Sequence, residues 1–166
     1  MLFYYDVMIK LLKSPLILLT YCQSVLRHMT AEQIMRRFNV KTITAEGMSE
    51  ILLLNMLEKL REALTDDRLQ ELLKCAKQST FAQIKLQLYE MDHDYLKCLR
   101  VIMRRQHFES ALEWISERLQ TLSHKAASNS KDSKLLKSRD SFEKEVLSWG
   151  LYLFKHDADG TVKMFE

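Results

Sequence analysis

Glycine and proline are scarce in this chain of 166 residues, which contains three glycines and one proline. These residues form most tight turns and bulges, so their scarcity disfavours a sheet-rich fold. Because the glycines stand alone at positions 47, 150 and 160, there is no glycine-rich loop for phosphate and no GxSxG turn for a nucleophilic serine. An HExxH zinc motif is also missing, and the five histidines are scattered. These absences predict a protein that is not an enzyme and uses no cofactor.

Cysteine is limited to Cys22, Cys75 and Cys98, which lie far apart and form no CxxC pair. An odd number at such spacing is typical of reduced thiols and predicts a cytoplasmic protein. The apolar run in "SPLILLTYCQSVL" is too short to span a bilayer, so we expect no transmembrane segment. Proline fits the first turn of a helix, and Pro15 therefore predicts the start of a buried helix.

Charge is nearly balanced, with 25 basic and 22 acidic side chains and a net charge of +3. This balance does not indicate nucleic acid as a partner. Residues 124–141 carry five lysines or arginines and two aspartates, which equals the net charge of the whole chain. The same stretch is polar and low in complexity, so we expect it to form a basic flexible loop.

Good helix formers dominate the rest of the chain, and apolar residues recur at helical spacing. Two start signals are clear: Ser14 before Pro15, and Thr30 with Gln33 in a capping-box spacing, while Ser49 is a candidate cap for the next helix. The pattern predicts an all-α fold of seven to nine short helices. They form either stacked helical hairpins, as in an α-solenoid segment, or a compact helical bundle. We expect a hairpin-repeat region at 1–123, the loop at 124–141, and a terminal helix with a turn-rich tail at 142–166.

The most regular stretch is "LYEMDHDYLKCLRVIMRRQHFESALEWISERL", residues 88–119. It predicts two amphipathic helices joined by a tight turn, and its length lies within the range of helical repeats. We expect a small residue to permit close approach of the helices while aromatic rings fill the groove between them. The residues predicted to hold this hairpin are structural: Tyr95, Leu99, Ile102, Phe108, Ala111, Leu112 and Ile115.

The elements "LYE", "DYLKCLRVIM" and "HFESALEWI" resemble clathrin heavy chain repeats, over about residues 80–119. They look most like the repeats of vacuolar protein sorting subunits in the HOPS and CORVET tethering complexes. The N-terminal β-propeller and the zinc-binding RING domain of those subunits are missing, which implies a fragment or a short relative. The resemblance implies a protein–protein interaction scaffold for vesicle-mediated protein transport. Its implied partners are sister subunits and a small GTPase, with peripheral association at endosome or lysosome/vacuole membranes.

The tail "KHDADGTVKMFE" offers a different function. It aligns with a twelve-residue EF-hand calcium loop, with Asp157 and Asp159 at positions 3 and 5, Gly160 at position 6 and Glu166 at position 12. Lys155 occupies position 1, where the first carboxylate is needed, so a tight turn between two extended segments is the competing interpretation. Three functions therefore stay open: the tethering scaffold, a calcium-responsive EF-hand relative, and a helical-bundle regulator without a role in trafficking.

Overall fold

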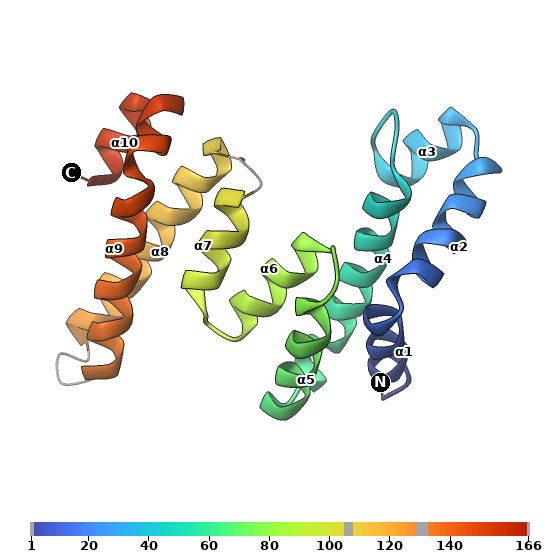
Figure 1. Cartoon of the computed structure of the whole chain (residues 1–166), viewed down its shortest axis with the longest axis horizontal. Coiled ribbons are helices and arrows are strands. Elements are labelled where there is room, and N and C mark those ends of the chain that lie inside the picture. Colours follow the sequence, from blue (N-terminus) through green and yellow to red (C-terminus); the bar gives the residue numbers. More distant parts are fainter. Residues whose placement is uncertain (1, 105–107, 129–132, 166) are drawn as a thin grey trace. The chain divides into compact units, whose positions relative to one another are not determined.

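The computed structural model describes residues 2–104, 108–128 and 133–165, and this part of the chain contains ten α-helices, one 3-10 turn and no strand (Figure 1). The predicted all-α class is therefore confirmed for these residues.

The chain divides into two compact units, residues 1–92 (unit 1) and 93–166 (unit 2). The boundary falls inside the region 1–123 that the sequence led us to treat as one. The elements are α1 (Leu2–Lys13), α2 (Pro15–Arg27), α3 (Ala31–Phe38), α4 (Ala45–Leu60), η1 (Arg61–Ala63), α5 (Asp66–Lys77), α6 (Ala82–Met91), α7 (Tyr95–Arg104), α8 (Phe108–Ser128), α9 (Ser133–His156) and α10 (Ala158–Phe165).

Helix α4 forms the centre of unit 1 and packs against α1, α2 and α6, while α5 packs against α1 and α6. Leu53, Leu57 and Leu60 recur at helical spacing on α4 and are buried. Burial of a leucine side chain contributes about 1.5–3 kcal/mol, so this face supplies much of the stability of the unit. The other fully buried large side chains of unit 1 are Met8, Leu12, Leu72, Phe81, Ile84 and Leu88.

Local sequence signals set the starts of α2 and α3, as predicted. Pro15 is the first residue of α2. At α3 the amide of Gln33 donates to Thr30 Oγ1 at 3.3 Å, and the amide of Thr30 donates to Gln33 Oε1 at 2.8 Å. This reciprocal pair is the predicted capping box, and it satisfies two free amides at the helix start. Asn39 ends α3 in the left-handed region at φ 54°.

The predicted cap at Ser49 is wrong, because α4 starts four residues earlier, at Ala45. Thr44 is the cap, and its Oγ1 accepts from the amide of Gly47 at 3.0 Å. Ser49 is buried inside α4, where its hydroxyl donates to the carbonyl of Ala45 at 2.6 Å. Threonine is a good N-cap residue, and Gly47, whose amide it accepts from, lies within the first turn of the helix and does not end it.

Two carboxylates link helices within unit 1. The hydroxyl of Tyr5 on α1 donates to Glu71 Oε2 on α5 at 2.5 Å, and burial together with this carboxylate raises the pKa of Tyr5 to about 12. Glu50 on α4 is buried, and its Oε1 accepts from the amide of Gln83 in the first turn of α6 at 3.0 Å. That amide has no partner inside its own helix, so Glu50 satisfies it across the helix interface.

Helix α9 forms the centre of unit 2 and packs against α7, α8 and α10, while α8 also contacts α7 and α10 (Figure 1). Each of the four helices therefore touches at least two others. The core takes side chains from all of α7, α8 and α9. Its fully buried large members are Leu99, Ile115, Phe142, Val146 and Leu153.

The flexible loop predicted at 124–141 is largely wrong. Helix α8 continues through Ser128 and α9 begins at Ser133, while residues 129–132 lie outside the described part of the chain. The stretch contains no glycine or proline, the residues that disfavour a helix most strongly. Arg139 Nε also pairs with Glu143 Oε1 at 2.7 Å, a spacing of four residues that supports a helix on its surface.

The turn-rich tail predicted after the last helix is also wrong. Helix α9 runs to His156, and α10 follows after the single residue Asp157. Asp157 Oδ1 accepts from the amide of Gly160 at 2.9 Å, so this carboxylate caps α10. An EF-hand loop instead wraps its carboxylates around an ion, whereas most of these positions belong to the helix α10. Asp159 lies in the first turn of α10, and Glu166 lies outside the described residues.

Among the described residues, no single helix is long and apolar enough to cross a membrane. Helices α1 (from Phe3) and α2 pass that test of length and composition only as a pair, and this pair is bent by 95° at Ser14.

Candidate functional site

Five of the seven residues predicted to hold the central hairpin lie in the core of unit 2. Leu99 and Ile102 on α7 and Ala111, Leu112 and Ile115 on α8 are all buried. Ala111 is fully covered, as close approach of two helices requires. Because a partner cannot reach these side chains, they position the surface of the unit and do not themselves bind.

Tyr95 is half-buried and belongs to an aromatic cluster that joins three helices. Its ring centroid lies 6.5 Å from that of Trp114 on α8, and Trp114 lies 6.0 Å from Phe142 on α9, both edge to face. The guanidinium of Arg118 lies 5.6 Å from the Tyr95 ring and 5.5 Å from the Trp114 ring. Phe108, the predicted neighbour of Tyr95, is the first residue of α8, and its side chain lies outside the described part of the structure.

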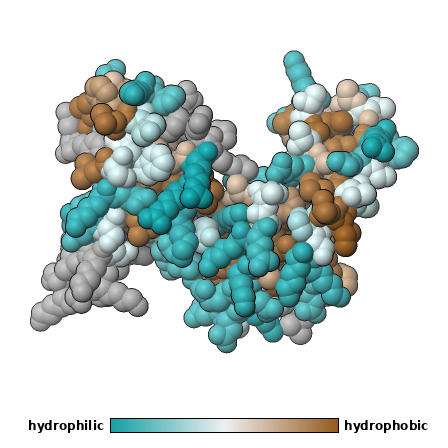
Figure 2. All heavy atoms as spheres, in the orientation of Figure 1, coloured by the Kyte–Doolittle hydropathy of each residue, from teal (hydrophilic) through white to brown (hydrophobic). Residues whose placement is uncertain are grey.

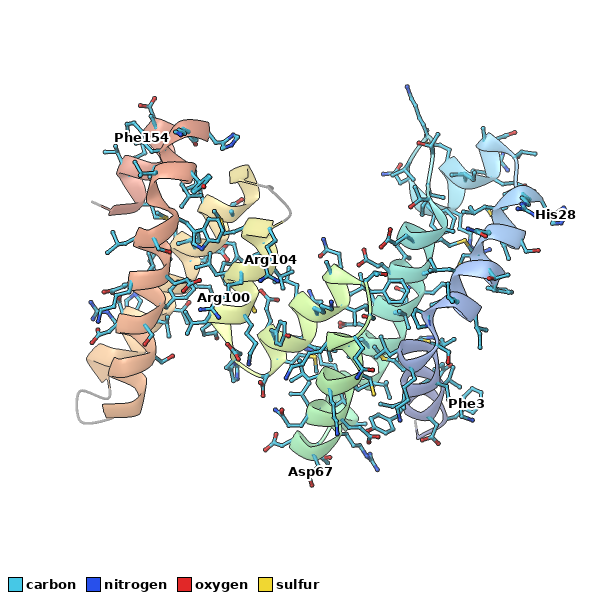
Figure 3. The ribbon with its side chains drawn as sticks, in the orientation of Figure 1. Phe3, His28, Asp67, Arg100, Arg104 and Phe154 are labelled. Atoms are coloured by element: carbon cyan, nitrogen blue, oxygen red, sulfur yellow. The ribbon has the colours of Figure 1, made fainter. Side chains whose placement is uncertain are left out.

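Arg100 on α7, labelled in Figure 3, makes a two-pronged ion pair with Glu145 on α9. Its Nε lies 2.9 Å from Oε1 and its second guanidinium nitrogen lies 3.0 Å from Oε2. The bonds from Arg100 hold the pKa of Glu145 below its usual range, and the carboxylate in turn raises the pKa of Arg100. The pair fixes the α7–α9 contact, and the sequence carried no signal for a partner 45 residues away.

Metal binding finds no support within the residues that the structure describes, where no three His, Cys, Asp or Glu side chains are grouped closely enough to hold an ion. Cys22, Cys75 and Cys98 are free thiols and are buried. The sulfur of Cys22 lies 3.3 Å from the hydroxyl oxygen of Ser49, a polar contact that joins α2 to α4. The cysteines therefore pack as small apolar residues of the two cores.

One exposed apolar surface runs along α9 in unit 2. Leu147, Leu151 and Phe154 follow the spacing i, i+4 and i+7, so they lie on one face of the helix. Leu151 is 77% exposed, and more than half of each of the other two is exposed. Gly150 lies on the same face, and a methyl group placed there would meet no atom within 4 Å. We call Leu147, Gly150, Leu151 and Phe154 the α9 stripe.

A second exposed apolar surface lies on α2 in unit 1. Leu16 is 75% exposed, and more than half of each of Ile17 and Tyr21 is exposed. We call these three residues the α2 ridge. The sequence predicted a buried helix here, but only Leu18 and Cys22 of α2 are buried. The prediction failed because the apolar residues of α2 cover more of its surface than the side that packs against unit 1, on which Leu18 and Cys22 lie.

An open groove of about 600 Å³ adjoins the α2 ridge. Its wall on α3 is polar and cationic, with Arg36 and Arg37, whereas Val25 and Met29 give the opposite side an apolar lining. His28, which follows α2, projects outward from unit 1 (Figure 3). Figure 2 shows hydrophobic surface over α2 and α3 and also near the C-terminal end of α9. The groove is lined by Tyr21, Ser24, Val25, His28, Met29, Gln33, Arg36 and Arg37.

No family model, curated protein or solved structure matches this chain. The function of the two exposed apolar surfaces and of the groove must therefore be inferred from the residues that form them. None of them groups an acid, a base and a nucleophile within the described residues, and all of them offer apolar area with a charged margin.

Proposed function

We propose that the protein is a non-enzymatic scaffold for protein–protein interactions, and that unit 2 presents its docking face. The observation that supports this most directly is the α9 stripe. Three large apolar side chains in line on one helix are unfavourable in water, and exposed apolar patches of this kind mark interaction sites. Covering a side chain such as Leu151 is worth about 1.5–3 kcal/mol, enough for the stripe to contribute strongly to a complex.

The chemistry of the α9 stripe suits a helix from a partner protein. Gly150 allows the backbone of an approaching helix to come close, while the leucines and Phe154 on either side can fill its grooves. Asp140, Lys144 and Lys155 lie near the same face and are exposed, so charges of both signs border the apolar area. A mixed border of this kind sets the register and orientation of a partner helix.

We further propose that the scaffold acts in vesicle tethering, as the resemblance of residues 80–119 to clathrin heavy chain repeats implies. The contact between α7 and α8, with Ala111 buried at it, agrees with the helical hairpin on which that resemblance rests. The implied partners are sister subunits of a tethering complex and a small GTPase. The site of action is then the cytoplasmic side of endosome or lysosome/vacuole membranes, with the chain a segment of stacked hairpins.

Affinity capture from a detergent-solubilised extract, followed by mass spectrometry, tests this function. We expect the chain to recover tethering-complex subunits, and Leu151→Ser together with Phe154→Ser to lose them. Leu16→Ser together with Ile17→Ser is the matched control, because these two side chains are also more than half exposed. Capture of no tethering subunit, or equal capture by the α9 variant, contradicts the proposal.

A second candidate is a compact helical-bundle regulator without a role in trafficking. The observation that favours it is the packing of α9 against α7, α8 and α10, which is closer to a bundle than to a row of hairpins that each contact only their neighbours. The same capture experiment separates the two. A partner that depends on Leu151 but belongs to no tethering complex supports the regulator.

A further inference from the structure

Helix α2 carries large apolar side chains on the face that points away from the core of unit 1. Leu18 and Cys22 face the core, whereas Leu16, Ile17 and Tyr21 face solvent. The exposed polar side of α2, which Thr20 and Ser24 mark, is flanked by these apolar side chains, an arrangement that suits a helix lying at a lipid surface. Contact with an apolar environment outside unit 1 would remove these side chains from water.

The charge around this helix has one sign. No aspartate or glutamate occurs between Asp6 and Glu32, a stretch that contains the whole of α2. Residues 1–44 hold six lysines or arginines and two acids, a net charge of +4. Residues 45–92 hold six basic and nine acidic side chains, a net charge of −3, so charge is segregated within unit 1. The α2 end of the unit attracts anions, and the α2 ridge carries no carboxylate that would repel them.

Helix α3 extends this cationic apolar surface. All eight of its residues are at least partly exposed, including Ile34, Met35 and Phe38 on its apolar side. Arg36 and Arg37 lie on its other side and line the groove next to the ridge. Arg36 pairs with Glu32 at 2.6 Å, and the guanidinium of Arg37 lies 5.9 Å from the Phe38 ring. A short amphipathic helix with arginines on its polar face is typical of elements that lie on a membrane surface.

We propose that the α2 ridge and the adjoining groove bind the surface of a membrane that contains anionic phospholipid. Leu16 and Ile17 enter the boundary between headgroups and acyl chains, and Tyr21 lies at headgroup level, where tyrosine is favoured. Arg36, Arg37 and His28 meet the lipid phosphates from the groove. A protein partner with an acidic patch fits the charge, but it explains less well why the most exposed side chains here are simple apolar ones.

This membrane contact is independent of the tethering function, since it uses unit 1 and not the α9 stripe. It differs from association through partners because it needs only the chain itself and lipid. Vesicle flotation with the purified full chain tests it, with phosphatidylcholine vesicles compared with vesicles that contain about one third phosphatidylserine. We expect flotation with the anionic vesicles, little with phosphatidylcholine alone, and weaker flotation at high salt because salt screens the lysines and arginines.

Two pairs of substitutions separate the charge from the apolar contact. Arg36→Gln with Arg37→Gln is expected to weaken binding about 25-fold, since each basic residue near an anionic surface contributes about fivefold. Leu16→Ser with Ile17→Ser is expected to weaken binding at least about tenfold at every salt concentration. Leu151→Ser with Phe154→Ser is the matched apolar control, and Arg61→Gln with Lys77→Gln is the matched charge control in unit 1. Circular dichroism verifies that each variant is as helical as the parent chain.

The result that overturns the proposal is absence of binding to anionic vesicles, or binding that the control pairs reduce as much as the test pairs. Light scattering of the lipid-free chain adds a second readout. If Leu16→Ser with Ile17→Ser turns an oligomer into a monomer and leaves flotation unchanged, the α2 ridge contacts a second copy of the chain and not lipid.

Discussion

Leu16 on α2 and Leu151 on α9 are almost equally exposed, at 75% and 77%, yet their surroundings differ in charge. Around Leu16 the nearest acids in sequence are Asp6 and Glu32, and arginines line the adjoining groove. Around Leu151 the exposed border carries charges of both signs, Asp140 together with Lys144 and Lys155. The comparison shows that exposed apolar area alone does not identify a partner. The sign and spacing of the charges at its margin distinguish a surface suited to lipid phosphates from one suited to another helix.

The two units also differ in the polar link that ties their helices together. Unit 1 joins α1 to α5 through a neutral hydroxyl on a carboxylate, Tyr5 to Glu71. Unit 2 joins α7 to α9 through an ion pair, Arg100 to Glu145. The first link depends on a proton that leaves at high pH, and the second depends on a carboxylate that is neutralised at low pH. The units are therefore expected to lose these links at opposite ends of the pH scale.

The largest expected effect comes from the two cores. Leu53→Ala in unit 1 and Leu99→Ala in unit 2 each remove a fully buried side chain and are expected to lower the free energy of unfolding by about 2–5 kcal/mol. Both tryptophans, Trp114 and Trp149, belong to unit 2, so their fluorescence reports that unit. Urea titrations followed by fluorescence and by circular dichroism measure the two effects. An equal shift of the fluorescence midpoint by Leu53→Ala would show that the units unfold as one.

A smaller effect is expected from Tyr5→Phe, which removes the hydrogen bond to Glu71 and is expected to cost about 1–2 kcal/mol at neutral pH. The pKa of Tyr5 is raised to about 12 from an ordinary value of 10. Its contribution is therefore fully present below pH 10 and is lost as the pH rises through about 12. Absorbance of tyrosinate during an alkaline titration gives the test. If the difference in free energy of unfolding between the parent chain and Tyr5→Phe persisted unchanged above pH 12, this account would be contradicted.

Two glycines of unit 2 are expected to respond in opposite directions. Gly150→Ala adds a methyl group to open space in the middle of α9 and is expected to stabilise the chain by about 0.5–1 kcal/mol. Gly160→Ala would clash with the carboxylate of Asp157 that caps α10, and is expected to destabilise by about 1 kcal/mol. Thermal denaturation measures both. If Gly150→Ala raises the melting temperature yet weakens partner capture, close approach at the α9 stripe is supported.

The smallest expected effect is that of Glu145→Gln in unit 2. The pKa of Glu145 is lowered by Arg100, so its contribution is present above the ordinary pKa of 4.5 and is lost as the pH falls through the lowered value. The pair is partly exposed, so the loss at neutral pH is expected to be smaller than that of Tyr5→Phe. Denaturation midpoints of the variant and the parent chain are expected to converge in acid. If the difference between the two midpoints instead widened in acid, the Arg100–Glu145 pair would not stabilise unit 2 in the way described.

The helices were predictable from the sequence where local chemistry sets them. Pro15 and the Thr30–Gln33 pair act on backbone groups within one turn, so their spacing alone predicts the result. The prediction of a turn at Gly160 was wrong because the role of this glycine depends on its three-dimensional surroundings. It was expected to form a turn, but it is needed inside a helix because the Asp157 carboxylate occupies the space beside it.

The candidate surfaces were not predictable, because they depend on which face of an apolar helix finds a partner in the fold. Leu16 and Leu18 are the same residue type two positions apart, yet only Leu18 meets the rest of unit 1. The ion pair of Arg100 with Glu145 likewise depends on the packing of α7 against α9. Sequence periodicity describes a helix face, whereas exposure of that face is a property of the assembled unit.

The separation of charge within unit 1 has a consequence before any contact is made. His28, beside the groove arginines Arg36 and Arg37, and Asp67, beside Asp66 at the start of α5, lie at opposite ends of this unit (Figure 3). The arginines at one end and the aspartates at the other give the unit an electric dipole. A dipole in the field of a negatively charged surface experiences a torque that turns its positive end inward. The unit would then reach the charged surface with α2 facing it, and fewer encounters would occur in orientations that cannot bind. Because this field decays within about 8 Å at physiological ionic strength, such alignment belongs to the last step of approach.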